Sequence, residues 1–285
     1  PVALADRGGW VNRDTTARFA EFAQIVADRF GDRLWSCAPI NEPWCVSWLS
    51  HFEGHHAPGL RDIRATARAM HHVLLGHGRA IEALRAAGVP NLGAVCNFED
   101  ALPLTDSAAD QAAAKRQEAI YSRFFLSGLR RGLYPSEVLD GREPHLPQNW
   151  QDDFPVLQAP LDWIGVNYYT CKRIAHADGA WPNIAYHDGP LEKTSMGWEI
   201  RPESFGHILQ IVRDYSEDLP VYITENGLSS DDDLIDGTVA DDQRLRYLRS
   251  HLAQVAAARE AGLYIRGYMV WSLLDNYEWA LGYEK

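Results

Sequence analysis

Cysteine is scarce in this sequence. Only four occur among 285 residues, and none belongs to a C-x-x-C pair: Cys37, Cys45, Cys96 and Cys171. Three of them lie in apolar, strand-like runs, so we expect buried free thiols in a reducing compartment rather than disulfides or a metal site. No signal-peptide pattern is present, and the expected location is cytoplasmic.

Long apolar runs and an excess of positive charge are also absent. No stretch of roughly 18 apolar residues occurs, so no membrane-spanning segment is expected. Lys and Arg number 27 against 39 Asp and Glu, which gives a net charge of -12. This balance argues against nucleic acid or an anionic membrane as a partner. A composition of 46% hydrophobic and 23% charged residues indicates a globular chain with a substantial core.

Helical and strand-like patterns alternate along the chain. Helices are predicted at residues 15–30, 63–87, 108–129, 202–215 and 241–261, with Asp14 or Thr15, Ser107 and Asp241 as caps. Strands are predicted at 34–40, 91–97, 161–169, 221–224 and 265–272, and long loops at 130–160 and 171–200. Apolar strands joined through helices predict a parallel sheet with right-handed crossovers, in a single domain over residues 1–285.

An open doubly wound sheet and a (β/α)8 barrel both fit this alternation, and the polar residues decide between them. Five consecutive strands each place a polar or aromatic group at or just beyond their C-terminal end: Asn41 and Glu42, Asn97, Asn167 and Tyr169, Glu225, and Trp271. This pattern is typical of a TIM barrel with its active site at the C-terminal face. A doubly wound fold usually has a glycine-rich phosphate turn, and no G-x-G-x-x-G occurs here.

Two of these residues are glutamates. Glu42 lies in the sequence Asn-Glu-Pro and Glu225 in Thr-Glu-Asn-Gly, each after an apolar run. A single glutamate at a strand end is more often a cap or a surface charge. Two carboxylates at the ends of two buried strands, however, are what the cleavage of a glycosidic bond requires.

Seven segments, in order, resemble glycoside hydrolase family 1, the retaining β-glucosidase family: DRGGW (6–10), NEPW (41–44), HAPG (56–59), NYY (167–169), SMGWE (195–199), YITENG (222–227) and WSLLDNYEW (271–279). The resemblance covers essentially the whole chain and implies a (β/α)8 barrel of which strands four to eight are present. It implies that the family's first three strands precede Pro1 and that a short closing segment follows Lys285. Those strands normally supply a Gln, a His-Trp pair and an Arg to the sugar site.

The resemblance also implies catalytic roles, residue by residue. Glu42 matches the general acid/base and Glu225 the nucleophile of a double displacement, whose carboxyl groups would be about 5–5.5 Å apart. Asn41 is expected to hydrogen-bond the sugar 2-OH, a contact that strengthens in the transition state. The alternative for Asn41 is a structural role in its own loop.

Five further residues are expected to bind substrate or orient the site. Tyr169 is expected to hydrogen-bond the nucleophile, and Asn167 to orient either of these two groups. Trp271 and Trp279 would offer flat faces to a pyranose, and Glu278 would accept hydrogen bonds from outer hydroxyls. The alternative for each aromatic residue is core packing, since the chain has ten tryptophans.

The expected enzyme is an exo-acting β-glucosidase that needs no cofactor. A carboxylate at Glu278 would repel a sugar phosphate, which favours unphosphorylated β-D-glucosides as substrates. The resemblance also implies overlap onto β-galactosides or β-fucosides, and a role in cellulose degradation. A metal site at His51, His55 and His56 is not expected, because this stretch is a Gly/Pro-rich loop rather than a clear helix.

The expected partner is a small β-glycoside or a short oligosaccharide. A homo-oligomer, or a companion segment that completes the barrel, is a further expectation. Two alternatives stay open: a non-catalytic glycan- or protein-binding fragment of the family, and a related barrel endoglucanase.

Overall fold

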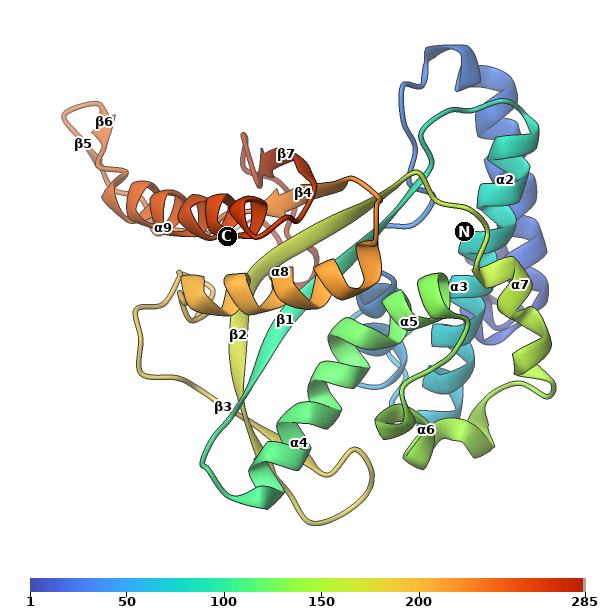
Figure 1. The fold of residues 1–285 in the computed structure, drawn as a ribbon, viewed down its shortest axis with the longest axis horizontal. Coiled ribbons are helices and arrows are strands. Elements are labelled where there is room, and N and C mark those ends of the chain that lie inside the picture. The colour runs from blue at the N-terminus through green and yellow to red at the C-terminus, as the bar shows by residue number, and fades with distance from the viewer. Residues whose placement is uncertain (284–285) are drawn as a thin grey trace. The chain divides into compact units, whose positions relative to one another are not determined.

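The computed structural model describes residues 1–283 and divides into two compact units. The first contains Pro1–Asn97 and Ala119–Gly165, and the second Phe98–Glu118 and Val166–Lys285. Two long strands, β1 (Gly93–Pro103) and β2 (Trp163–His176), begin in the first unit and continue into the second (Figure 1).

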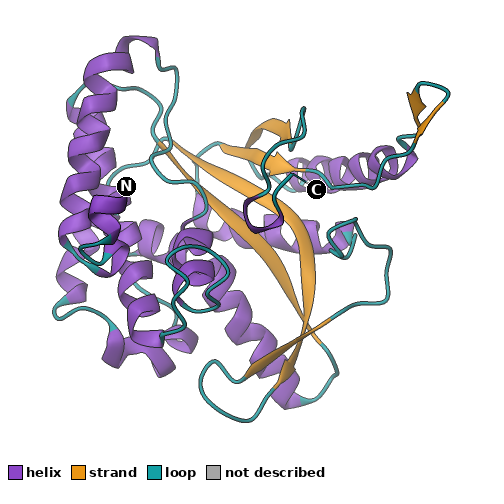
Figure 2. Cartoon of the chain, turned by 180° about the vertical axis from the view of Figure 1, so that it is seen from behind, coloured by secondary structure: helices purple, strands orange, loops and turns teal. Residues whose placement is uncertain are grey.

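The first unit is mainly helical. Its helices are α1 (Val2–Ala5), α2 (Asp14–Phe30), α3 (Ile63–Ala86), α5 (Phe124–Arg131), α6 (Ser136–Arg142) and α7 (Phe154–Leu157). Helices α2 and α3 pack side by side (Figures 1 and 2). The Asp62 carboxylate caps α3 by accepting hydrogen bonds from the amides of Arg64 and Ala65. Most of the middle of α3 is buried, so this helix forms the core of the unit.

The second unit is built on a sheet with the strand order β1-β2-β4-β7, and β3 (Ile184–His187) pairs antiparallel with β2. Strands β4 (Val221–Asn226) and β7 (Ile265–Val270) are parallel. Its helices are α4 (Ala108–Glu118), α8 (Pro202–Ser216) and α9 (Asp242–Glu260). Strands β5 (Leu234–Ile235) and β6 (Thr238–Val239) form a small separate hairpin, which precedes α9. Figure 2 shows the long strands of this sheet in orange.

The predicted long helices are present, with one interruption. The expected helix over 108–129 is divided by a π-helical turn at Ala119–Arg123, between α4 and α5. The expected cap at Ser107 is confirmed, because its Oγ accepts a hydrogen bond from the Asp110 amide. The caps at Asp14 and Thr15 are wrong, since Arg13 occupies the N-cap position of α2. Asp241 is the N-cap of α9 but makes no capping hydrogen bond with its side chain.

The loop predicted at 130–160 is wrong. It contains α6, α7 and two short 3-10 helices, Glu143–His145 and Trp150–Asp153. Prolines mark starts of these helices rather than loops, as at Pro135 before α6 and in the first turn of α7. The loop predicted at 171–200 is wrong in part, since β2 extends to His176 and β3 follows.

Three strand predictions also need correction. The strand predicted at 34–40 is wrong, because this segment and the next residue form only isolated parallel bridges, Cys37 to Leu92 and Asn41 to Val95. Pro39 lies between them and cannot donate a backbone hydrogen bond. Strands β1 and β2 run past their predicted ends, so Asn97 and Tyr169 lie within strands rather than at strand ends.

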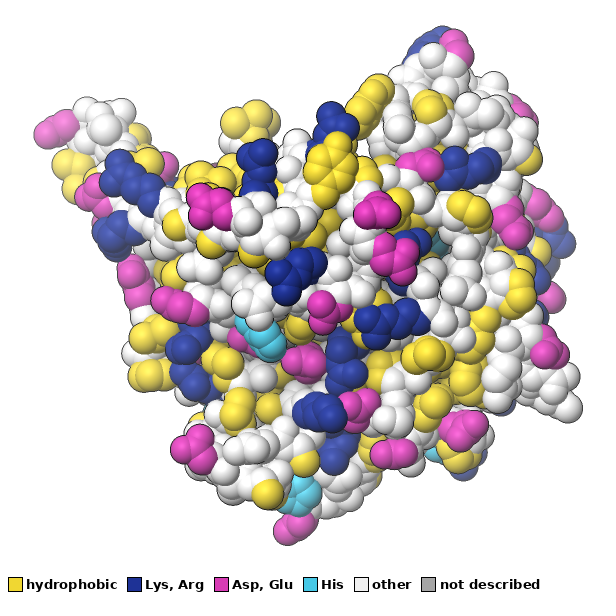
Figure 3. Space-filling model, viewed as in Figure 1, with side chains coloured by type: hydrophobic (Ala, Val, Ile, Leu, Met, Phe, Trp, Pro, Cys, Tyr) yellow, Lys and Arg dark blue, Asp and Glu magenta, His cyan; other side chains and the backbone are white. Residues whose placement is uncertain are grey.

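All four cysteines are free thiols, of which Cys96 and Cys171 are buried and the other two half-buried. Within residues 1–283, no helix is long and apolar enough to cross a membrane. Acidic and basic side chains are interspersed over the face seen in Figure 3.

Candidate active site

In the first unit, Glu42 is held at the end of the bridged segment beside β1. Its amide donates to the Val95 carbonyl at 3.1 Å, next to the parallel bridge between Asn41 and Val95. The Glu42 carbonyl accepts from the Val46 amide at 3.1 Å. Glu42 has a φ of 51°, in the left-handed region that residues with a side chain rarely adopt. Such strain is typical of functional positions, where the surrounding structure holds the side chain in place.

An aromatic cluster supports this turn. The buried Trp44 ring stacks on Tyr121 with 4.0 Å between ring centroids. Asn97 donates to the Tyr121 hydroxyl at 3.0 Å and to the Cys45 sulfur at 3.4 Å. Burial raises the pKa of the Cys96 thiol to about 12, and the Glu42 carboxylate adds to this shift. Cys96 therefore stays protonated and is not a nucleophile.

In the second unit, Glu225 lies near the end of β4. The Tyr169 hydroxyl donates to Glu225 Oε2 at 2.6 Å, so the structure contains the hydrogen bond expected between these side chains. Thr224 Oγ1 donates to Asn167 Oδ1 at 2.6 Å, and Asn167 is completely buried. Asn167 thus fastens β4 to β2 immediately before Glu225.

The expected sugar-binding residues follow β7. The Trp271 amide donates to the Asn226 carbonyl at 3.0 Å, which ties Trp271 to the residue after Glu225. Glu278 and Trp279 come later, in a loop closed by a hydrogen bond of 2.7 Å from the Glu278 amide to the Gly282 carbonyl. Trp271 and Trp279 are 44% and 69% exposed as whole residues.

The structure brings the expected residues together in two sets. Asn41 and Glu42 belong to the first unit, and Asn167, Tyr169, Glu225 and the residues after β7 belong to the second. Because the two glutamates lie in different units, the expected separation of their carboxyl groups stays a prediction.

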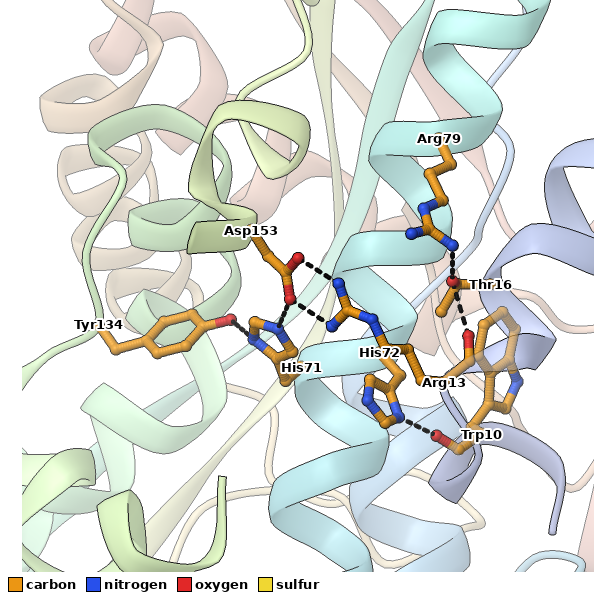
Figure 4. A network of polar contacts seen from close by, with 8 residues as sticks. All are labelled: Trp10, Arg13, Thr16, His71, His72, Arg79, Tyr134 and Asp153. Carbon is orange, nitrogen blue, oxygen red and sulfur yellow. Dashed lines mark hydrogen bonds and ion pairs between the residues drawn. The ribbon is translucent and has the colours of Figure 1, made fainter. Parts of the chain in front are cut away.

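A buried polar network in the first unit was not anticipated from the sequence (Figure 4). His71 lies at its centre, donating from Nε2 to Asp153 Oδ2 at 2.9 Å and accepting at Nδ1 from the Tyr134 hydroxyl at 2.8 Å. Arg13 binds the Asp153 carboxylate through both terminal nitrogens. Burial lowers the pKa of His71, which keeps the ring neutral.

An open cleft of about 590 Å³ borders this network. Its walls carry two arginines and two aspartates, Arg13, Arg68, Asp152 and Asp153, so the formal charges balance.

A metal site at His51, His55 and His56 is not expected from the sequence. His51 is buried, and its Nδ1 donates a hydrogen bond to the Ser47 carbonyl at 3.0 Å. In the part of the chain that the structure describes, no group of three His, Cys, Asp or Glu side chains could hold a metal ion.

Parallel strands that alternate with helices define an α/β protein. Glu225 lies near the end of β4, and Glu42 follows a segment that is bridged to β1. This placement is typical of the (β/α)8-barrel class. The family model for glycosyl hydrolase family 1 matches residues 1–285. The chain is 38% identical to β-glucosidase A of Thermotoga maritima over 288 residues, covering 100% of this chain and 65% of that protein. It is 36% identical to a bifunctional β-D-glucosidase/β-D-fucosidase of Bifidobacterium breve, covering 98% of this chain and 64% of the relative.

A solved structure agrees with the sequence matches. The family 1 glycoside hydrolase of Thermotoga maritima, in complex with a cyclophellitol analogue that mimics the transition state, superposes with a TM-score of 0.96. It is 39% identical, and the match covers 100% of this chain and 65% of that chain. The chain belongs to glycosyl hydrolase family 1, whose fold is a (β/α)8 barrel. It spans about 65% of the length of the first curated relative that it matches.

Proposed function

We propose that this chain carries the catalytic carboxylates of a retaining exo-β-glycosidase that hydrolyses terminal, unphosphorylated β-D-glucosides. Glu225 is the nucleophile and Glu42 the general acid/base. The names of the β-glucosidase relatives support β-glucosides as the substrates, and the name of the bifunctional β-D-glucosidase/β-D-fucosidase supports overlap onto β-fucosides. Cytoplasmic residence and the use of cellulose-derived oligosaccharides belong to the same proposal. The four free thiols support the first of these.

The reaction takes two displacements. In the first, the Glu225 carboxylate attacks the anomeric carbon while Glu42 gives its proton to the leaving glycosidic oxygen, forming a glycosyl ester on Glu225. In the second, Glu42 removes a proton from water, and the water oxygen attacks the same carbon and releases Glu225. Two inversions at one carbon retain the configuration.

The observation that carries this proposal is the hydrogen bond of 2.6 Å from Tyr169 to Glu225. A phenol that donates to one carboxylate oxygen fixes the plane of the carboxyl group and stabilises its charged form. A nucleophilic carboxylate needs both properties. A surface charge or a helix cap needs neither.

A 2-deoxy-2-fluoro β-glucoside with a good leaving group tests the nucleophile. The inactivator should label Glu225, which peptide mass spectrometry would locate, and Glu225→Gln should take no label. Label on another carboxylate would contradict the assignment of Glu225. A folded chain that takes no label at all would contradict activity of this chain.

The Glu42→Ala variant tests the acid/base. With an activated aryl glucoside, formation of the glycosyl ester needs little acid assistance, so the second displacement should become limiting. We expect kcat to fall by about 10²- to 10⁴-fold. Added azide, which needs no general base, should restore turnover and give a β-glucosyl azide. Failure of azide to raise the rate would contradict the role of Glu42.

We also propose that a further segment of a barrel, from the same protein or a second chain, completes the sugar site. In the described sheet, β7 lies at the end of the strand order with β4 as its neighbour. Met269 and Val270 at its end are about half exposed. A closed barrel leaves no such edge. Light scattering would distinguish a homo-oligomer, which could cover this edge, from a monomer that leaves it for another segment.

A further inference from the structure

Asn226, the residue after Glu225, is the centre of a buried hydrogen-bonding hub in the second unit. Its Nδ2 group donates to the Tyr168 carbonyl at 2.6 Å and to the Tyr247 hydroxyl at 2.9 Å. Its Oδ1 accepts from the Tyr268 hydroxyl at 2.5 Å. The Asn226 side chain is completely buried. These partners come from β2, α9 and β7, so one amide side chain links three elements to the end of β4.

Tyr247 of α9 connects this hub to the partner of the nucleophile. Its hydroxyl accepts a hydrogen bond from the Asn226 side chain at 2.9 Å and donates to the Tyr169 carbonyl at 3.2 Å. The side chain of Tyr169 in turn binds Glu225. Burial raises the pKa of the Tyr247 hydroxyl, which therefore keeps the proton that it donates. One hydroxyl thus contacts the backbone of Tyr169 and the side chain of the residue that follows Glu225.

The Tyr247 ring is itself held in place by His251, one turn further along α9. The His251 ring stacks on it with 3.7 Å between centroids, and His251 Nδ1 donates to the Tyr247 carbonyl at 2.8 Å. Both side chains are essentially inaccessible to solvent. A buried polar group whose neighbours are packed and hydrogen-bonded in this way has one arrangement, so it restrains what it contacts.

The same hub reaches the expected sugar platform. The Asn226 carbonyl accepts the Trp271 amide, and a Cβ atom at Gly227 would lie 2.0 Å from the Trp271 carbonyl oxygen. Only glycine permits this close approach of the residue after β4 to the residue after β7. The backbone of Trp271 is therefore set against the turn that carries Glu225.

We propose that Tyr247, supported by Tyr268, is a positioning residue that holds Glu225, Tyr169 and Trp271 in one rigid arrangement. The inference rests on the proposed role of Glu225 as nucleophile. Reacting groups must be held close to their productive geometry, and a displacement of about 1 Å can cost about 10²-fold in rate. The buried hydrogen bonds around Asn226 and Tyr247 link Glu225, Tyr169 and Trp271. They supply this restraint without contacting the sugar.

A crystal structure of the Tyr247→Phe variant tests the restraint without any need for turnover. Phe keeps the ring stacked on His251 but removes the hydroxyl that binds the Asn226 side chain and the Tyr169 carbonyl. We expect the distance from Tyr169 Oη to Glu225 Oε2 to lengthen from 2.6 Å. An unchanged distance, with Trp271 also in place, would overturn the proposal. Tyr268→Phe removes a single bond to Asn226 and is the milder variant if Tyr247→Phe fails to fold.

Kinetics provide the second readout. In Tyr247→Phe, kcat for an aryl β-glucoside should fall by about 10- to 100-fold while KM changes little. The rate of labelling of Glu225 by the fluoro-glucoside should fall in parallel. Tyr134→Phe is the matched control, because it removes a buried hydroxyl that binds His71 in the first unit. That variant should lose stability but keep kcat.

The two proposals fail separately. A wild-type chain that neither turns over nor takes label contradicts the proposed function, while the crystallographic comparison still decides whether Tyr247 positions Glu225. A Tyr247→Phe variant with a lower melting temperature but the kcat and labelling rate of the wild type would show a merely structural role, and would overturn the inference.

Discussion

At the scale of single residues, the hydrogen bond from Tyr169 to Glu225 is the contact in the second unit that bears most directly on the proposed nucleophile. Its donor is a neutral phenol and its acceptor a carboxylate, at 2.6 Å. Hydrogen bonds to charged groups contribute about 1.5–3 kcal/mol. The orientation of the carboxylate therefore depends measurably on one hydroxyl.

The Tyr169→Phe variant should consequently be a poor catalyst that folds normally. Loss of about 1.5–3 kcal/mol of transition-state stabilisation corresponds to a decrease of about 10- to 100-fold in kcat/KM. Steady-state kinetics with an aryl β-glucoside would measure it. Tyr186→Phe is a suitable control, since this exposed tyrosine of β3 donates a long bond of 3.3 Å to Gln117. Equal losses in both variants would argue against a special role for Tyr169.

The roles of single residues could be predicted from the sequence where the residues lie in a short local motif. The glutamates and Tyr169 lie in short motifs that the family resemblance identifies. The hub around Asn226 could not be predicted, because Tyr247 and Tyr268 are distant in the chain and resemble ordinary core aromatics. The position of α9 brings the Tyr247 hydroxyl to Asn226, and the pairing of β7 with β4 brings the Tyr268 hydroxyl there.

At the scale of elements, α3 packs closely against its neighbours because two of its residues lack side chains. A Cβ atom at Gly78 would lie 2.0 Å from the Val156 carbonyl oxygen of α7, and one at Gly76 would lie 2.9 Å from the Trp10 ring. Glycine inside a helix costs roughly 1 kcal/mol relative to alanine. The close approach of α7 offsets that cost.

Gly78→Ala should therefore destabilise the chain despite the better helix propensity of alanine. The added methyl meets backbone that cannot rotate away, and overpacking of this kind costs about 1–3 kcal/mol or more. Urea denaturation would measure the loss. In the control Gly31→Ala, the new Cβ would meet a Val89 methyl at an ordinary 3.4 Å, so stability should hardly change. If Gly78→Ala leaves the free energy of unfolding unchanged, α7 can move to make room for the added methyl group, and the expectation is wrong.

Elements differ in how much of them the sequence predicts. Long helices such as α2 and α8 are predicted to within a residue or two, because periodicity accumulates over many residues. The short helices between 130 and 160 carry too few turns to show a period. The segment at 34–40 has strand composition, but Pro39 and its irregular pairing reduce it to bridges.

At the scale of the whole molecule, both units bury histidines in neutral form. His72, His77 and His251 are each nearly inaccessible, and burial lowers the pKa of each to about 4. In the unfolded chain a histidine has a pKa of about 6.5. Between these values the unfolded state binds protons that the folded state does not. Stability is therefore fully present above about pH 6.5 and falls as the pH drops toward 4.

The free energy of unfolding should consequently decrease by several kcal/mol between pH 7 and pH 5, at up to about 1.4 kcal/mol per pH unit for each of the three histidines. Urea denaturation at a series of pH values and constant ionic strength would measure the slope. His77→Gln keeps a donor for the Gly93 carbonyl, which His77 contacts at 3.3 Å, but does not titrate, so it should make the slope shallower. His187→Gln, at an exposed position on β3, is the matched control. A stability that stays constant from pH 7 to pH 5 would mean that these histidines are not held neutral by burial.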